Sequence, residues 1–299
     1  MSVYNEKFYD NQLKGSLNSA REILPYIKEI IDPKSVIDVG CGLGTWLSVF
    51  KELGVEDILG LDGEWVNKKQ LLIPEKNFIA TNLEDPLELN REFDLAISLE
   101  VAEHITKEKD ENFIEYLTKK SPIILFSAAI PFQGGTNHIN EQWPEYWIKL
   151  FNNNDYIVID CIRSRIWYNE NIDWWYVQNI FLFVEKNHLS NNQKLKELKD
   201  NSKNFFSVIH PKLYSNKINE IKKYKEKIGI ITKNYEMKIN IQNDQYSAEI
   251  AKYKKIFDIQ NKHIKKLDSH IKKYEQKTTE YEKIFDIQNK HIKKLDSHI

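Results

Sequence analysis

A short apolar run that ends directly in a glycine-rich turn constrains the fold of this 299-residue chain more than any other feature. Residues 35–39 read Ser-Val-Ile-Asp-Val, and residues 40–44 read Gly-Cys-Gly-Leu-Gly. The β-branched residues favour a strand, the glycines favour a tight turn, and the pattern that follows, up to about Gly54, favours a helix. Strand, tight turn and helix in this order indicate the start of an α/β fold.

Strand-like and helix-like segments continue to alternate along the chain. An amphipathic helix is expected over residues 16–31, because apolar residues recur there every three or four positions. A pair of late strands is separated by a stretch too short for an ordinary crossover helix, so we expect that pair to be antiparallel. The pattern predicts a Rossmann-like, seven-stranded, doubly wound α/β sheet with an antiparallel last strand. The expected strands are residues 35–39, 58–62, 77–80, 93–99, 122–127, 156–160 and 175–184.

The balance of charge divides the chain into two dissimilar parts. Residues 1–188 carry 18 basic and 30 acidic groups, whereas residues 189–299 carry 25 lysines and 14 acidic groups. All seven tryptophans and nine of the ten glycines lie in the first part. We therefore expect a globular domain at residues 1–188 and a helical linker at residues 189–249. A domain with a net charge of −12 would repel phosphates, so nucleic acid is not an expected partner.

An internal repeat occupies the end of the chain. Residues 253–271 reappear as residues 281–299 with one change, and the period of 28 residues equals four heptads. Positions a and d of these heptads are mostly apolar and the other positions mostly polar. This pattern predicts a C-terminal α-helical coiled coil over residues 250–299 and a homo-oligomer formed through it. A single solvated helix without a partner is the alternative.

Cysteine usage and hydropathy bear on the compartment. Two cysteines, Cys41 and Cys161, cannot build a disulfide framework. The chain contains no run of 18 apolar residues and does not begin with a basic stretch followed by an apolar one. We therefore expect a cytoplasmic protein with no transmembrane segment.

The spacing within the glycine-rich turn bears on which nucleotide could bind there. A dinucleotide fingerprint needs Gly or Ala at position 45, where this chain has Thr45, and the Lys-Ser/Thr pair of the ATP-binding phosphate loop is absent. NAD and ATP are thus disfavoured. Asp38, before the turn, can accept a hydrogen bond from an amino group, and Asp62, after the second strand, can accept both hydroxyls of a ribose.

Three segments resemble the class I S-adenosylmethionine-dependent methyltransferases: residues 36–44 (VIDVGCGLG), 61–63 (LDG) and 94–105 (DLAISLEVAEHI). The resemblance covers about residues 1–186 and implies S-adenosylmethionine as the cofactor. In that family the glycine-rich turn lies under the amino-acid part of the cofactor, the acid after the second strand holds the ribose, and the segment after the third strand approaches the adenine. Many members have Asp where this chain has Asn82, whose amide can still meet adenine. The matching positions here are Asp38, Gly40, Cys41 and Gly42, then Asp62 with Gly63, then Asn82 with Leu83.

The segment Glu-Val-Ala-Glu-His after the fourth strand is a candidate metal site. It is similar to the segment of quinone-biosynthesis O-methyltransferases that can hold a divalent metal. If a helix begins here, Glu100, Glu103 and His104 share one face at the carboxyl end of the sheet. Oxygen ligands with one imidazole suit Mg or Mn. In the alternative, Glu100 touches the cofactor, Glu103 caps the helix and His104 packs.

Two further segments, His-Ile-Asn-Glu-Gln-Trp at 138–143 and Trp-Trp-Tyr-Val-Gln-Asn at 174–179, resemble a branch of bacterial methyltransferases associated with surface polysaccharides. That resemblance implies a small polar acceptor such as a sugar, a nucleotide sugar or a phosphoramidate, methylated on oxygen or nitrogen. Transfer to a hydroxyl benefits from a base, for which His138 and then His104 are the candidates. A histidine that only fixes its loop is the alternative for His138. A coiled-coil scaffold carrying a non-catalytic methyltransferase-like domain is the alternative for the whole chain.

Overall fold

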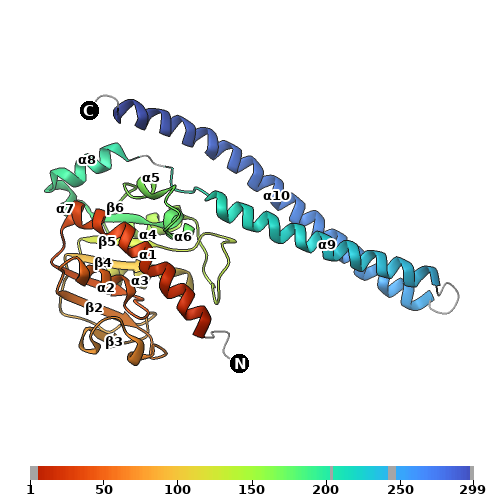
Figure 1. The fold of residues 1–299 in the computed structure, drawn as a ribbon, viewed down its shortest axis with the longest axis horizontal. Coiled ribbons are helices and arrows are strands. Elements are labelled where there is room, and N and C mark those ends of the chain that lie inside the picture. The colour runs from red at the N-terminus through yellow and green to blue at the C-terminus, as the bar shows by residue number, and fades with distance from the viewer. Residues whose placement is uncertain (1–5, 203–204, 242–246, 297–299) are drawn as a thin grey trace. The chain divides into compact units, whose positions relative to one another are not determined.

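The computed structural model describes residues 6–202, 205–241 and 247–296. The chain divides into two compact units, Met1–Ser207 and Val208–Ile299 (Figure 1). Among the described residues, no helix combines the length and the apolar character that crossing a membrane requires.

The first unit is built around one seven-stranded sheet with the order β3-β2-β1-β4-β5-β7-β6. Neighbouring strands pair parallel except that β7 is antiparallel to both β5 and β6. This topology confirms the Rossmann-like sheet with an antiparallel last strand. The strands are β1 (Ser35–Val39), β2 (Asp57–Asp62), β3 (Phe78–Ala80), β4 (Leu95–Leu99), β5 (Ile123–Ser127), β6 (Tyr156–Ile159) and β7 (Phe181–Glu185).

The helices bury apolar stripes against this sheet. Strands β4 and β5 are buried along their whole length, which their unbroken apolar sequences require. In the core, Phe151 from α4 stacks on Phe183 from β7 with ring centroids 3.8 Å apart. The helices of this unit are α1 (Glu6–Ile31), α2 (Thr45–Glu52), α3 (Asp110–Thr118), α4 (Pro144–Asn153), α5 (Arg163–Ile166), α6 (Trp174–Asn179), α7 (Lys186–Ser190) and α8 (Gln193–Asn201), with short 3-10 turns η1 (Lys68–Gln70), η2 (Glu75–Asn77) and η3 (Ala102–His104).

The strand predicted over residues 175–184 is wrong in its first half. Residues 174–179 form helix α6, and only Phe181–Glu185 enters the sheet as β7. The aromatic and β-branched residues of this run favour a strand locally, but Gln178 and Asn179 are buried polar side chains that need partners. The helical turn places both amides against other polar side chains, described below, before the chain reaches the sheet.

The second unit is a pair of long helices, α9 (Pro211–Ile241) and α10 (Ser247–Asp296). They run antiparallel and contact each other, with Lys225 of α9 paired to Asp268 of α10 at 2.8 Å (Figure 1). The half-buried residues of α10 include the predicted a and d positions Ile264, Leu267, Ile271 and Tyr274. The partner of this seam in the structure is therefore α9 of the same chain. The last residues of the predicted coiled coil, 297–299, lie outside the described residues.

Candidate functional site

The carboxyl ends of the parallel strands β1 to β5 lie at one edge of the sheet, and the predicted site residues lie at these ends or in the loops that follow them. Ligands of open α/β sheets bind at this edge, where the strand order changes direction. Here the change lies between β1 and β4. The loops after these strands therefore form the candidate site.

The glycine-rich turn between β1 and α2 has a backbone that other residues could not easily adopt. Gly40 and Gly44 have φ values of 93° and 78°, and a Cβ on Gly40 would lie 2.3 Å from a methyl carbon of Val101. At Gly42, with φ 53°, no described atom lies within 4 Å of the Cβ position. The turn is thus closed toward Val101 and open at Gly42, where a ligand can approach the backbone.

Asp62, at the end of β2, holds this turn through its carboxylate. Its Oδ2 accepts a hydrogen bond from the Gly42 amide and its Oδ1 accepts one from the Gly63 amide, each at 2.7 Å. Burial raises the pKa of Asp62, and the hydrogen bonds from Gly42, Gly63 and Trp65 oppose that rise. A carboxylate offers about four acceptor sites, so one remains for a further donor such as a ribose hydroxyl.

Trp65 is a residue of this site that the sequence reasoning missed. A Cβ on Gly63 would lie 2.2 Å from the Trp65 indole ring, so the ring covers Gly63 at van der Waals distance from its backbone. The side chain is nevertheless 77% exposed. A large exposed aromatic ring beside a ribose-type carboxylate offers a stacking surface for a flat ligand. The signal was the tryptophan two residues after the Asp62-Gly63 pair.

Asp38 and Cys41 lie deeper in the site. Asp38 is buried, and its pKa is raised well above the usual range by burial and then by the neighbouring Asp62 carboxylate. The Cys41 thiol lies so close to Gly60 that a Cβ there would be 2.6 Å from its Sγ. The Cys41 side chain therefore faces the sheet, and burial raises the pKa of its thiol.

Asn82 and Leu83 follow β3 in a tight turn. Leu83 is buried in the core, whereas Asn82 is exposed. The Asn82 side-chain oxygen accepts a hydrogen bond from the Glu84 amide at 3.1 Å, which fixes the side chain. This bond orients the side chain. Its amide nitrogen remains a hydrogen-bond donor, which an adenine ring nitrogen can accept.

Glu100 is held in a network of amide side chains. It has a φ of 57°, which is unusual for a residue other than glycine. Its carboxylate accepts hydrogen bonds from Gln133 at 2.8 Å and from Asn179 at 3.0 Å, and Gln178 donates to Asn179 at 2.9 Å. Burial raises the pKa of Glu100, and these amide donors oppose the rise. Sequence reasoning missed this network because its members are distant in the chain.

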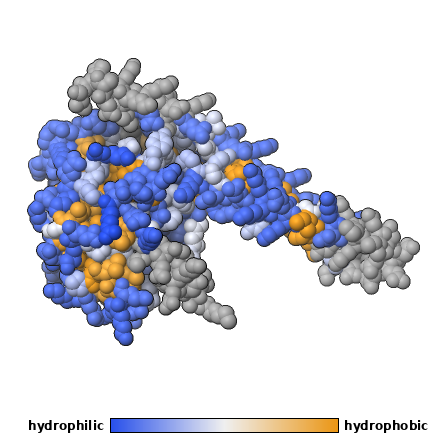
Figure 2. Space-filling view, viewed as in Figure 1, coloured by the Kyte–Doolittle hydropathy of each residue, from blue (hydrophilic) through white to orange (hydrophobic). Residues whose placement is uncertain are grey.

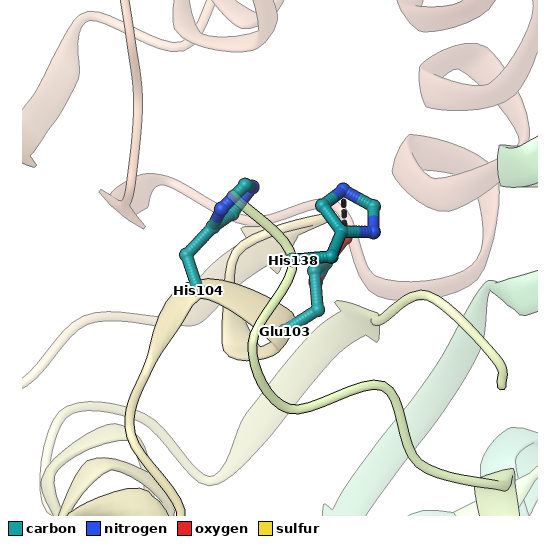
Figure 3. A group of neighbouring side chains, drawn as sticks. All are labelled: Glu103, His104 and His138. Atoms are coloured by element: carbon teal, nitrogen blue, oxygen red, sulfur yellow. Dashed lines mark ion pairs between the residues drawn. The ribbon is translucent and has the colours of Figure 1, made fainter. Parts of the chain in front are cut away.

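Glu103, His104 and His138 form a second group, and their side chains come together across two loops (Figure 3). One potential ligand atom from each lies within 4.8 Å of the others. The two imidazole rings meet edge to face with centroids 4.9 Å apart, and His138 Nε2 lies 3.9 Å from Glu103 Oε1. Glu100 belongs to the amide network and not to this group, because η3 is a short 3-10 turn and not the α-helix that would align all three predicted ligands.

The Glu103 carboxylate is the most unusual group of the site. It is fully buried, and among the described residues no donor forms a hydrogen bond with either oxygen. Burial, followed by the neighbouring Glu100 carboxylate, raises its pKa well above the usual range. Burial and then His138 lower the pKa of His104. A buried carboxylate without donors beside two imidazoles can hold a divalent cation or a proton.

Comparison with known proteins gives a partial match. Residues 9–127 match a family model described as a methyltransferase domain. A ubiquinone biosynthesis O-methyltransferase of Dictyostelium discoideum is 28% identical over 135 residues, covering 40% of this chain and 37% of that protein. A ribosomal protein L11 methyltransferase of Fusobacterium nucleatum is 31% identical over 108 residues, covering 32% of this chain and 33% of that protein. The chain thus spans little more than a third of the length of these relatives.

Solved structures with a similar arrangement include the methyltransferase domain of a bacterial CtHen1, at 21% identity and a TM-score of 0.42 over 56% of this chain and 99% of that one. The magnesium protoporphyrin IX methyltransferase of Synechocystis PCC 6803, solved with bound S-adenosylhomocysteine, is 15% identical with a TM-score of 0.42 over 62% of this chain and 90% of that one.

Proposed function

We propose that this chain, whose residues 9–127 match a methyltransferase domain model, is a class I S-adenosylmethionine-dependent methyltransferase that transfers a methyl group to oxygen or nitrogen of a small polar acceptor. The main support is that the open turn at Gly42 is hydrogen-bonded to the Asp62 carboxylate at the edge of the sheet where the strand order changes direction. The exposed backbone at Gly42 and a carboxylate that can accept a hydrogen bond from a ribose hydroxyl suit an adenosyl cofactor.

The proposed cofactor residues are those that the family resemblance implies. Asp38 and the backbone of residues 40–42 would hold the amino-acid part, Asp62 with Gly63 the ribose, and Asn82 with Leu83 the adenine. S-adenosylmethionine supplies a methyl group activated by a sulfonium. The chain's contribution is to aim an acceptor lone pair along the line of displacement and to exclude water.

A divalent transition metal such as Mn fits the second group of residues better than Mg, which prefers oxygen ligands. Glu103, His104 and His138 would hold it, through one buried carboxylate and two imidazoles. Glu100 lies beside this group as a second carboxylate, although its oxygens already accept hydrogen bonds from amide side chains. Such an ion would lower the pKa of an acceptor hydroxyl. Without a metal, His138 or His104 would take the proton directly.

The proposed acceptor is a sugar, a nucleotide sugar or a phosphoramidate destined for a surface polysaccharide. Support comes from the two tryptophan-containing segments and from the net charge of −12 of residues 1–188, which disfavours a polyanion. A cytoplasmic location fits such a substrate, and both cysteines are free and buried.

Self-association through the helical hairpin is proposed from its surface. Figure 2 shows apolar side chains over the helices α9 and α10, and a helix pair that leaves such residues exposed can pair with a second copy. They lie in the stretch 224–231 of α9 and in the stretch 253–259 of α10. These exposed residues are Tyr224, Ile230, Ile231, Tyr253, Ile256, Phe257 and Ile259.

The test uses the intact chain with S-adenosylmethionine labelled in its methyl group. Label should move to a sugar, nucleotide sugar or phosphoramidate acceptor, and Glu103→Gln should abolish the transfer. Loss of turnover in EDTA with recovery on adding Mg or Mn supports the metal, whereas full activity in EDTA contradicts it and favours a histidine base. Label that moves only to an RNA oligonucleotide contradicts the proposed acceptor. Cofactor binding without transfer to any acceptor contradicts the enzyme and favours the scaffold.

A further inference from the structure

The loop after β5, residues 131–143, is held in a conformation that ordinary residues avoid. Phe132 and Asn137 have φ values of 67° and 59°, and Gly134 has a φ of 77°. An aromatic residue in the left-handed region is strained, and such strain persists only where the surroundings fix it. The structure therefore contains a feature that pins this loop.

That feature is the side chain of Glu141. Its Oε2 accepts a hydrogen bond from the Phe132 amide at 2.7 Å, and its Oε1 accepts one from the Gly134 amide at 2.9 Å. The same Oε1 lies 3.0 Å from Nδ1 of His138. One carboxylate, with a side chain only 19% exposed, thus binds two of the residues with positive φ and an imidazole of the candidate site.

The partner of each imidazole decides which ring nitrogen carries the proton. A carboxylate only accepts hydrogen bonds, so His138 donates from Nδ1 to Glu141 and presents a bare Nε2 toward Glu103, 3.9 Å away. The carbonyl of Asn137 accepts in the same way from Nδ1 of His104 at 3.1 Å. Both rings thereby present Nε2, the arrangement that a metal ligand or a proton acceptor needs.

Two other contacts confine the loop and the ring. The amides of Ile139 and Asn140 donate to the carbonyl of Glu103 at 2.9 and 3.0 Å, which docks the loop on η3. The imidazole of His138 lies against Gly135 so closely that a Cβ there would be 2.1 Å from Nε2. The ring is therefore packed against the Gly135 backbone, and Glu141 determines which ring nitrogen carries the proton.

We propose that Glu141 is a positioning residue, which pins loop 131–143 and fixes the His138 tautomer so that Nε2 faces Glu103. The proposal rests on the proposed function only for the role of His138 in the reaction. The tautomer of His138 does not depend on that function. A glutamine in place of Glu141 would offer one acceptor oxygen to three donors, so at least one contact would be lost.

The first measurement needs no variant. Nitrogen-15 NMR of histidine-labelled full-length protein at about pH 8.5, roughly two units above the ordinary imidazole pKa, reports the tautomer of each neutral ring. The signal of His138 is assigned by its loss in His138→Gln. A proton on Nδ1 is the expected result, and a proton on Nε2 overturns the proposal.

The second measurement compares Glu141→Gln with Glu108→Gln, an exposed control of the same chemistry. Glu141→Gln should mix the tautomers of His138 and lower kcat about 10- to 100-fold while the affinity for S-adenosylhomocysteine stays unchanged. An unchanged tautomer in Glu141→Gln overturns the proposal. Mixed tautomers with an unchanged kcat would support Glu141 as the residue that fixes the tautomer but refute the role of His138 in the reaction. Failure of this proposal and failure of the proposed function therefore give different results.

Discussion

Replacing Asp62 by asparagine tests the cofactor assignment at its best-defined group. The Asp62 carboxylate accepts hydrogen bonds from the Gly42 and Gly63 amides and from Trp65, and leaves one acceptor site for a ribose hydroxyl. The asparagine side chain would keep only one oxygen, so one hydroxyl loses an acceptor. A hydrogen bond to a charged group contributes about 1.5–3 kcal/mol, which predicts an affinity lower by about 10- to 150-fold.

The same change affects stability, and this effect must be separated from binding. One backbone amide of the turn also loses its acceptor, at a cost of about 1.5–3 kcal/mol, or about 3–12 °C in Tm for a domain of this size. Because burial raises the pKa of Asp62, a neutral amide recovers part of that cost, and the lower end is expected. The Tm therefore serves as the folding control.

The assay is calorimetric titration of S-adenosylhomocysteine into wild type, Asp62→Asn and Glu64→Gln. Glu64 is exposed and two residues away, so its variant makes the same chemical change outside the turn. Wild-type affinity is expected for Glu64→Gln. A folded Asp62→Asn protein that binds within about twofold of wild type would refute the ribose assignment.

Three other outcomes follow from the structure. Burial raises the folded pKa of Asp38, so ionising this residue lowers the stability as the pH rises above about 4. Asp38→Asn should therefore have a higher Tm than wild type at pH 8 and a similar Tm at pH 4. Equal Tm values at both pH values would contradict this. In urea unfolding, Gly40→Ala should cost more than Gly54→Ala, because both have positive φ but only Gly40 lies against Val101; equal losses would mean that the close approach is unimportant. Deleting residues 250–299 should reduce the mass in light scattering to a single chain, and a persisting larger species would show that α10 is not the self-association element.

The local sequence was sufficient to predict secondary structure where a segment strongly favours one conformation. Residues 35–39 form β1 with the predicted bounds, because an apolar β-branched run between a proline and a glycine-rich turn has no competing structure. Asp62 was predictable for the same reason, since it ends a strand beside that turn. Residues 175–179 were mispredicted as strand because the partners of Gln178 and Asn179 come from Gln133 and Glu100, far away in the chain.

The candidate metal group shows the same limit. The sequence spacing grouped Glu100, Glu103 and His104, but a positive φ at Glu100 and a 3-10 turn after it separate the first acid from the other two. His138 takes its place from a loop 34 residues further along the chain. Its position depends on the contacts of Glu141 with Phe132 and Gly134, and a one-dimensional pattern does not encode such contacts.

The central claim is that the glycine-rich turn and Asp62 hold an adenosyl cofactor for methyl transfer. Titration of the intact chain by calorimetry with S-adenosylmethionine, S-adenosylhomocysteine and NAD tests it most directly. The account predicts micromolar binding of the first two and none of NAD. A folded protein that binds neither, or that binds NAD as well as S-adenosylmethionine, would contradict it.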